Sequence, residues 1–213
     1  TRPASTTKGA TPTTTYNVFS PKAGIVYQPI TSTSFYVSYS NNFTTNRGVD
    51  VYGNLLPASI INQYEVGAKN TFADGKFSAN LSIYKIINSN FAQQAPYLSD
   101  GVTPNTNPNI KTLSGETTSD GIEIGCNGNI ASNFYFITGY SYNDIRFTHT
   151  SGEKGSNIEG ERLVDAPAHT ANAALFYTFN KTLKGLKIGA GGFYTGPRLG
   201  GYNNKVGQSI SGN

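Results

Sequence analysis

Eight stretches of this chain alternate apolar and polar side chains with a period of two, and several are longer than ten residues. Successive side chains of a β-strand point to opposite faces, so this pattern predicts strands with one apolar and one polar face. Strands of this length suit a membrane crossing better than a soluble domain, where about 5–6 residues is usual. The expected strands cover residues 20–28, 33–43, 61–72, 76–91, 113–128, 133–149, 163–179 and 186–195.

The connections between these stretches alternate between short and long. Asp74-Gly75, between two alternating runs, is a strong signal for a tight hairpin turn. The other short connections are 29–32, 130–132 and 180–185, whereas 44–60, 92–112 and 150–162 are long, and the ends 1–19 and 196–213 also read as loops. Tight turns at one end and long loops at the other predict an all-β fold, an antiparallel up-and-down wall of a transmembrane β-barrel.

The composition fits two different faces. Charged residues make up only 13% of the chain and hydrophobic ones only 37%, while Asn, Thr and Ser together number 66. A neutral polar face suits a wet barrel lumen, whereas the polar face of a soluble β-sandwich, the alternative fold, would carry more charge. The aromatic residues near strand ends suit the girdles of a membrane barrel; they are Tyr27, Tyr39, Tyr64, Tyr142, Tyr177, Phe179 and Tyr194.

Enzymatic and nucleic-acid-binding functions find no support in the motifs. There is no nucleophile elbow, no P-loop and no His/Cys spacing of a metal site, and His149 and His169 are isolated. Lysine and arginine do not cluster, so the net charge of +4 does not indicate nucleic acid. We therefore expect no catalytic residues, no metal site and no resident cofactor.

Two glutamates, Glu65 and Glu123, are expected on the polar faces of neighbouring strands. They could form an acid pair of the kind that glycosidases use. The alternative is that they pair with Lys69, with Lys187 or with a domain that fills the lumen, and we favour this structural role.

Five pieces of the chain resemble, in order, the barrel of TonB-dependent siderophore receptors. FSPKAGIVYQPITSTSFYVSYSNNF is similar to the family's "G-x-V-Y-x-P" and "S-x-Y-x-S-Y-S" strands. INQYEVGAKNTFADGKFSANLSIYKI resembles its "Q-Y-E-V-G-x-K" hairpin, and GETTSDGIEIGCNGNI its "G-E-x-x-S-x-G-x-E" strand. ERLVDAPAHTANAALFYTF and GLKIGAGGFYTGPR resemble the "L-x-x-A-P-x-H" and "G-L-x-x-G-x-G-x-x-Y-x-G-x-R" strands. No piece is decisive alone, but the order covers nearly the whole chain from about residue 18.

The resemblance implies a place in the outer membrane of a Gram-negative bacterium. It implies that residues 1–213 form part of one 22-stranded barrel domain, an open run of about eight strands, roughly the twelfth to the nineteenth. The N-terminal plug and the last strands are then expected to be absent from this chain. The implied function is active transport of ferric siderophores, in which an inner-membrane TonB-type complex acts through the plug and lipid surrounds the barrel.

The resemblance places ligand capture in the loops at the barrel mouth. Aromatic and arginine side chains in or beside these loops are the expected contacts with the iron(III)–siderophore complex: Phe43, Arg47, Tyr52, Phe91, Tyr97, Arg198 and Tyr202. The alternative cargoes are haem, cobalamin and an oligosaccharide. His149 is the candidate ligand for haem. A further alternative is a complete, closed eight-stranded barrel with a structural or adhesive role, in which the first and eighth strands would pair.

Overall fold

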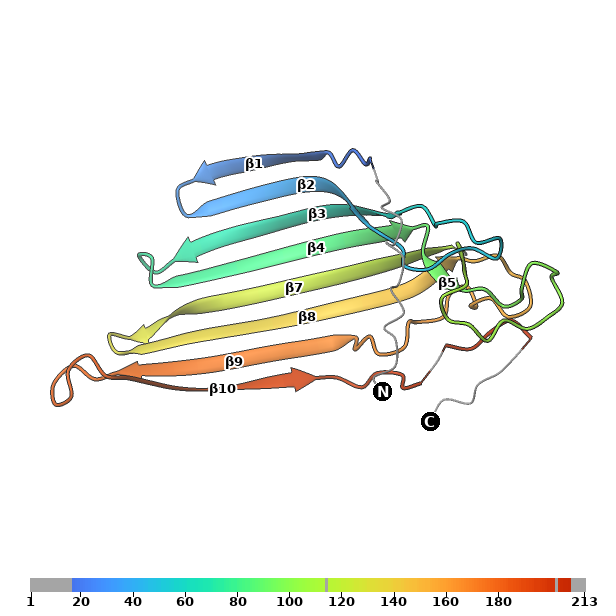
Figure 1. Ribbon diagram of the computed structural model, residues 1–213. Helices are drawn as coiled ribbons and strands as arrows, with labels where there is room; N and C mark the ends of the chain where they lie inside the picture. Colours follow the sequence, from blue (N-terminus) through green and yellow to red (C-terminus); the bar gives the residue numbers. More distant parts are fainter. Residues whose placement is uncertain (1–16, 114, 202, 208–213) are drawn as a thin grey trace, which may run out of the picture.

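A computed structural model describes residues 17–113, 115–201 and 203–207 of the chain. Eight strands form one antiparallel sheet in the order β1-β2-β3-β4-β7-β8-β9-β10, in which each strand pairs with its neighbours along the chain (Figure 1). Their bounds are β1 Lys22–Ile30, β2 Thr33–Thr44, β3 Ser59–Phe72, β4 Phe77–Ser89, β7 Glu116–Ala131, β8 Phe134–His149, β9 His169–Thr178 and β10 Lys187–Thr195. A second, two-stranded sheet consists of β5 Ala92–Gln94 and β6 Lys111–Leu113.

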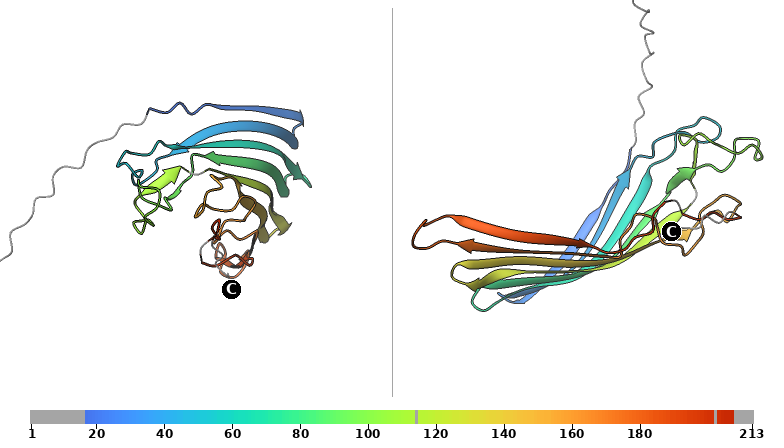
Figure 2. Two further views of the ribbon diagram at one scale, coloured as in Figure 1. Left: turned by 90° about the vertical axis from the view of Figure 1, so that its right-hand side faces the viewer. Right: turned by 90° about the horizontal axis from the view of Figure 1, so that it is seen from below.

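The large sheet is open. Among the described residues, β1 and β10 each pair with a single strand and not with each other. Seen nearly along its strands, the sheet forms an arc, and the long connections fold over its concave side (Figure 2). The closed eight-stranded barrel is therefore wrong for this chain.

Two of the eight expected strands begin three or more residues later than predicted. The strand expected from residue 163 begins at His169, because Asp165 has a left-handed backbone (φ 58°) and Pro167 has no N–H for a ladder bond. The strand expected from residue 113 begins at Glu116 as β7, after Gly115. Gly115 has a φ of +150°, and a Cβ there would overlap the carbonyl of His149.

The hairpin turns lie where the sequence predicts them. At the β3–β4 turn, Ala73 and Asp74 both have a positive φ, followed by Gly75, and the Lys76 N–H donates to the Ala73 carbonyl at 3.1 Å. All four tight turns lie at one end of the sheet and all long connections at the other (Figure 1). The loop asymmetry read from the sequence is thus confirmed.

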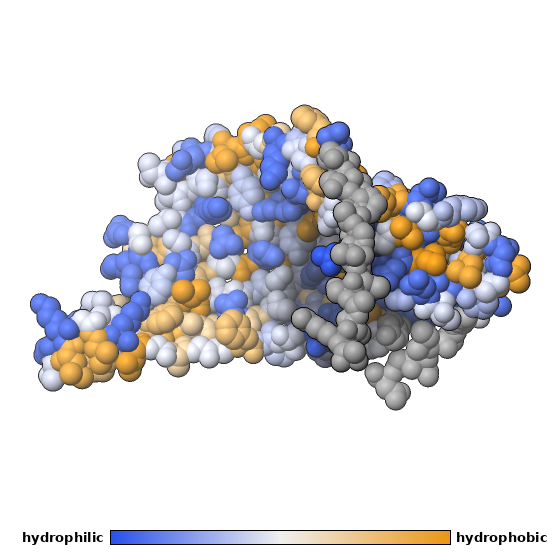
Figure 3. All heavy atoms as spheres, in the orientation of Figure 1, coloured by the Kyte–Doolittle hydropathy of each residue, from blue (hydrophilic) through white to orange (hydrophobic). Residues whose placement is uncertain are grey.

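The strand register separates the two faces that the alternation predicts. The outer, convex face carries Val37, Val66, Ile83 and Ile122 in one cross-strand row. The inner, concave face carries Tyr36, Glu65, Tyr84 and Glu123, and Figure 3, which looks onto it, shows many hydrophilic residues over the strands. Large outer-face side chains of β2–β4 are between 41 and 61% exposed: Phe35, Val37, Tyr64, Val66, Leu81 and Ile83.

The outer face carries an apolar band that is bordered by charged and aromatic side chains. On β4 it is apolar from Phe77 to Ile83 and ends at Lys85, whose Nζ lies 3.0 Å from Asp120 Oδ1. The eight residue steps from Phe77 to Lys85 span about 26 Å along the strand, or about 20 Å along the membrane normal at a tilt of about 40°. Aromatic pairs lie near both borders, with centroid distances of 5.4 Å for Phe72–Phe77, 4.8 Å for Phe134–Tyr177, 5.2 Å for Tyr39–Tyr64 and 5.2 Å for Tyr142–His169.

The inner face packs large side chains against small ones on the next strand. The Tyr36 ring lies over Gly67 and the Tyr84 ring over Gly121, so that a Cβ at either glycine would overlap the ring. Side chains converge on the concave side of a curved sheet, and the glycines provide the room for these rings. This packing stabilises the curvature that a barrel wall needs.

The two glutamates do not lie on neighbouring strands, which corrects the prediction, because β4 separates Glu65 on β3 from Glu123 on β7. Glu65 accepts hydrogen bonds from Tyr36 Oη (2.6 Å) and Gln63 Nε2 (2.9 Å). Lys69 Nζ instead lies 5.6 Å from the centre of the Tyr36 ring, and Lys187 Nζ 4.8 Å from that of Phe176. The glutamates belong to a polar inner surface and are not arranged as an acid pair.

Candidate ligand-binding site at the loop end

The long connections pack together into one layer beyond the strands. We call this layer the loop cap and define it as residues 45–58, 90–113, 115, 150–168, 196–201 and 203–207. The buried hydrophobic residues of the described chain lie in it or at the adjoining end of β8: Leu56, Ala58, Ala95, Phe147 and Ala168. The ring of Phe91 packs edge-on against Phe147 with centroids 6.1 Å apart. The loop cap therefore contains the only hydrophobic core among the residues that the structure describes.

Backbone hydrogen bonds join loops that lie far apart along the chain. Val49 N–H donates to the Asn109 carbonyl at 3.0 Å, and Lys111 N–H to the Val49 carbonyl at 2.8 Å, which ties loop 45–58 to loop 90–113. Gly155 N–H donates to the Val206 carbonyl at 2.9 Å, and Val206 N–H to the Ser156 carbonyl at 2.8 Å. These bonds satisfy buried backbone groups and fix the loops relative to one another.

Short polar side chains set the turns inside the cap. Asp50 Oδ1 accepts the backbone N–H groups of Tyr52 (2.9 Å) and Asn54 (2.8 Å), and hydrogen bonds from the Asn54 side chain and these amides lower the pKa of Asp50. Asp100 bonds Thr103 in the same way, through its hydroxyl and its N–H, and these bonds lower the pKa of Asp100. Bonds to the ionised form favour it, so both turns depend on carboxylates.

Two adjoining cavities open in the cap, of about 420 and 790 Å³. They share a wall of Ala95, Pro96, Tyr97, Gly101 and Lys154. Loop 150–168 adds Ser151 and Ser156 to the smaller cavity, and the segment after β10 adds Lys205 to the larger one. Loop 45–58 adds Val51 to the smaller cavity, so the cavities lie where four segments distant in sequence meet.

A buried polar chain supports both cavities. Lys205 Nζ donates to Asn157 Oδ1, and Asn157 Nδ2 donates to Gln93 Oε1. Asn157 and Gln93 are buried, at 4% and 8% exposure, and burial lowers the pKa of Lys205. The chain presents a partly desolvated ammonium group to the larger cavity and a buried amide to the smaller one.

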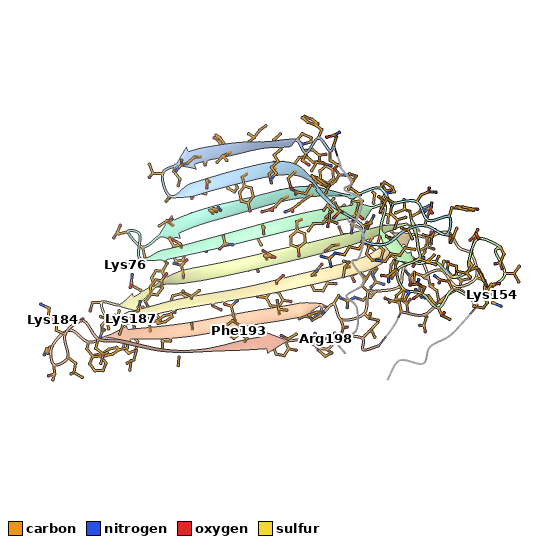
Figure 4. All side chains as sticks on the ribbon, in the orientation of Figure 1. Lys76, Lys154, Lys184, Lys187, Phe193 and Arg198 are labelled. Carbon is orange, nitrogen blue, oxygen red and sulfur yellow. The ribbon has the colours of Figure 1, made fainter. Side chains whose placement is uncertain are left out.

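The residues predicted to bind ligand lie in different places. Tyr97 lines both cavities, and Arg47 and Tyr52 are exposed on loop 45–58, with Tyr52 at 75%. Phe91 packs on Phe147, and Phe43 lies in β2 on the outer face, opposite Ile60 of β3. Arg198 follows β10, with its Nε 3.7 Å from Asp165 Oδ1, and Figure 4 shows it far from Lys154 at the tip of the cap. Tyr202 lies outside the described residues.

Gln93, Lys154 and Lys205 are the polar cavity residues of most interest among those not predicted from the sequence. Their position in long polar loops was visible, and a search for cations could have found the two lysines. Gln93 carries no local signal, because its burial depends on a partner 64 residues away. Within residues 17–113, 115–201 and 203–207, no three His, Cys, Asp or Glu side chains form a group that could hold a metal ion.

Comparison with known proteins decides the family. The model of the family "TonB dependent receptor-like, beta-barrel" matches residues 1–212. The chain belongs to this family. It is thus a receptor barrel of the Gram-negative outer membrane and not an enzyme. No helix among the described residues is long and apolar enough to cross a membrane.

Several characterised receptors are similar to the chain. The metal-pseudopaline receptor CntO of Pseudomonas aeruginosa is 27% identical over 188 residues, which cover 87% of this chain and 25% of that protein. The ferric-pyoverdine 358 receptor of Pseudomonas putida is 30% identical over 150 residues, 70% of this chain and 17% of that protein. The ferripyoverdine receptor of P. aeruginosa, solved with ferripyoverdine, shares the fold with a TM-score of 0.68 at 21% identity, covering 91% of this chain and 25% of that one. The chain spans a quarter or less of each of these relatives.

Proposed function

We propose that the protein takes up a ferric siderophore across the outer membrane and that residues 1–213 form part of a larger barrel. The observation that carries this proposal is the family match over residues 1–212, together with relatives whose names specify ferric siderophores. The ferrichrome outer membrane transporter/phage receptor of Escherichia coli, for example, is 28% identical over 85% of this chain. The cargo is then iron(III) as its siderophore complex, and no resident cofactor is needed.

The geometry supports a division of roles in this transport. The loop cap faces the outside and meets the ligand first, the outer face contacts lipid, and the polar inner face lines the passage. The edges of β1 and β10 present unpaired backbone groups, which cannot remain unpaired in lipid, so further strands of the full receptor complete the barrel. A plug inside that barrel, moved by the inner-membrane TonB-type complex, releases the ligand inward.

Growth of the source bacterium under iron limitation tests this function. A strain that lacks the full-length gene is compared with its parent on single siderophores chosen to span net charge: anionic ferric citrate, neutral ferrichrome and cationic ferrioxamine B, with siderophore extracted from the strain's own medium. The deletion is expected to abolish growth on at least one source, and the intact gene to restore it. Equal growth of both strains on every source would contradict the iron assignment.

A second candidate cargo is a chelate of another transition metal. It is favoured by the similarity to CntO, named a metal-pseudopaline receptor, over 87% of this chain. Cells with and without the gene are compared for uptake of radioactive zinc and nickel in the presence of the strain's own spent medium. A loss of zinc or nickel uptake with normal iron uptake would transfer the assignment to this cargo.

A further inference from the structure

The charges around the larger cavity have one sign. Among the described residues that line it, the charged ones are Lys154 and Lys205, and the others include the amides of Gln94 and Asn105 and the ring of Tyr97. Glu161 lies close enough to act on Lys205, and Glu153 lines the smaller cavity beside Lys154. The larger cavity itself therefore offers two ammonium groups and no lining carboxylate.

A buried donor in the smaller cavity lacks a partner. Gln93 is 8% exposed, and its Nε2 makes no hydrogen bond, whereas its Oε1 is occupied by Asn157 Nδ2. An amide N–H without a partner in a buried place is rare in proteins and favours an acceptor that arrives from outside. This donor is independent of the lysines and points to the same kind of ligand, one rich in oxygen acceptors.

Lys205 retains the capacity to bind a ligand. An ammonium group has three donors, and Asn157 Oδ1 accepts one of them. Burial keeps water from fully solvating the ammonium group, which lowers the pKa of Lys205, and a nearby anion would favour its charged form. Lys154 lies at the outer tip of the cap, where an incoming molecule arrives first (Figure 4).

We propose that the paired cavities bind the anionic, oxygen-rich part of a metal chelate, with carboxylate or equivalent oxygens between Lys154 and Lys205. Tyr97 packs against the body of the ligand, and Gln93 Nε2 donates to a further oxygen. This inference rests on the proposed function and specifies it, because it selects anionic chelates over neutral or cationic ones. Of the loop residues predicted from the sequence, Tyr97 is thus the one that contacts the ligand in this proposal.

The test measures equilibrium binding of iron-55 chelates to cells that carry the full-length receptor in a strain without other siderophore receptors. The probes are ferric citrate, ferrichrome and ferrioxamine B, together with the chelate that supports growth through the receptor. The variant is Lys154→Gln with Lys205→Gln. The matched control is Lys184→Gln with Lys76→Gln, which removes the same charge at the turn end of the sheet (Figure 4).

The cavity variant is expected to weaken binding of an anionic chelate by about tenfold or more, since each lost charge-assisted hydrogen bond is worth about a decade in affinity. Any binding of a neutral chelate should change by less than about twofold, and the control should bind like the wild type. Gln93→Leu, which nearly keeps the volume but removes the donor together with the acceptor of Asn157 Nδ2, should weaken binding of the same chelate by a few-fold. Limited proteolysis checks that the loops of each variant remain folded.

Two results would overturn the inference and can be told apart. If the wild type binds and transports chelates but the lysine variant binds the anionic one unchanged, the cavity assignment fails and the proposed function stands. If the wild type binds and transports no ferric chelate, including that from its own medium, the proposed function fails and this inference fails with it.

Discussion

The sheet and the loop cap differ in where their stability comes from. In the loop cap and at the adjoining end of β8, hydrophobic side chains such as Leu56, Ala95 and Phe147 are buried against protein. In the sheet, the large hydrophobic side chains of the outer face stay exposed, as Val37 and Val66 do. The cap therefore folds as a soluble domain does, whereas the sheet relies on lipid and on neighbouring strands to cover its apolar face.

This difference explains how one chain can combine a constant wall with a specific recognition surface. Substitutions in the wall must respect the lipid and the ladder of backbone hydrogen bonds, whatever the ligand. Substitutions at the cavity walls leave the apolar band of the wall untouched, because the cap meets the sheet at its loop end, where Ser59 of β3 donates to Asn46 Oδ1 and to the Asn90 carbonyl. In the full-length receptor, a substitution in one region should therefore change the stability of that region and leave the other region folded.

The largest effect is expected from Phe147→Ala, which empties the centre of the cap core. Phe147 is 4% exposed and packs on Phe91, and removal of a buried Phe side chain costs about 3–5 kcal/mol. The cap should become sensitive to added protease and exchange its amide hydrogens faster, while the barrel keeps its resistance to SDS. Tyr52→Ala, which truncates an exposed aromatic of the same cap, is the control; an unfolded barrel in Phe147→Ala would show that wall and cap are one unit.

A charge in the middle of the outer face should destabilise the wall without altering any residue of the loop cap. Leu81 lies halfway along the apolar band between Ala68 and Ile124. Leu81→Lys should cost about 2–4 kcal/mol in the free energy of unfolding from lipid vesicles, measured in urea. The adjacent Asn80→Lys puts the same charge on the inner face and should cost less than about 1 kcal/mol. Equal costs at the two positions would contradict the assignment of the faces.

A smaller effect is expected where a ring packs on a glycine of the inner face. A Cβ at Gly121 would overlap the Tyr84 ring, so Gly121→Val should destabilise the wall by about 1–3 kcal/mol. Combining it with Tyr84→Ser, which removes the ring, should restore part of this loss. A double-mutant cycle in the same urea assay measures the coupling, and strictly additive effects would show that the ring does not fill this space.

The smallest effect concerns the turn at Asp50 in the cap. Folding lowers the pKa of Asp50 below its ordinary value of 3.8, so the carboxylate stabilises the turn fully above that value. The stabilisation is lost as the pH falls through the lowered pKa, and the protection factors of residues 50–54 against hydrogen exchange should then fall. In Asp50→Asn, which keeps an acceptor oxygen without titrating, this acid-induced loss of protection should vanish; the same loss in both proteins would rule out Asp50 as its cause.

Much of the wall could be predicted from the sequence, because successive residues of a strand point to opposite faces and the two faces therefore appear as an alternation in the sequence. The alternation around Leu81 and Ile83 gave both the strand and its apolar face, and Asp74-Gly75 located a turn. The end of a strand was less predictable where backbone conformation decides it, as at Asp165 and Gly115.

The site resisted prediction because it depends on contacts between distant segments. Asn157 joins Gln93, 64 residues before it, to Lys205, 48 residues after it. Aromatic and arginine side chains in the loops were the predicted ligand contacts because of their chemistry, and of these Tyr97 lies in a cavity wall. The lysines and the buried glutamine became visible only when the loops were seen together.

The most direct test of the account asks which medium each face of the wall contacts. Spin labels are placed one at a time at residues 79–83 of β4 in the full-length receptor, with Cys126 and any cysteine outside residues 1–213 replaced by Ser, and the receptor is reconstituted in liposomes. Power saturation then compares access of oxygen, which dissolves in lipid, with that of a water-soluble nickel complex. The account predicts strict alternation, with oxygen favoured at Ala79, Leu81 and Ile83 and nickel at Asn80 and Ser82. Uniform access to either reagent, or alternation of the opposite phase, would contradict a lipid-facing apolar side and a wet polar interior.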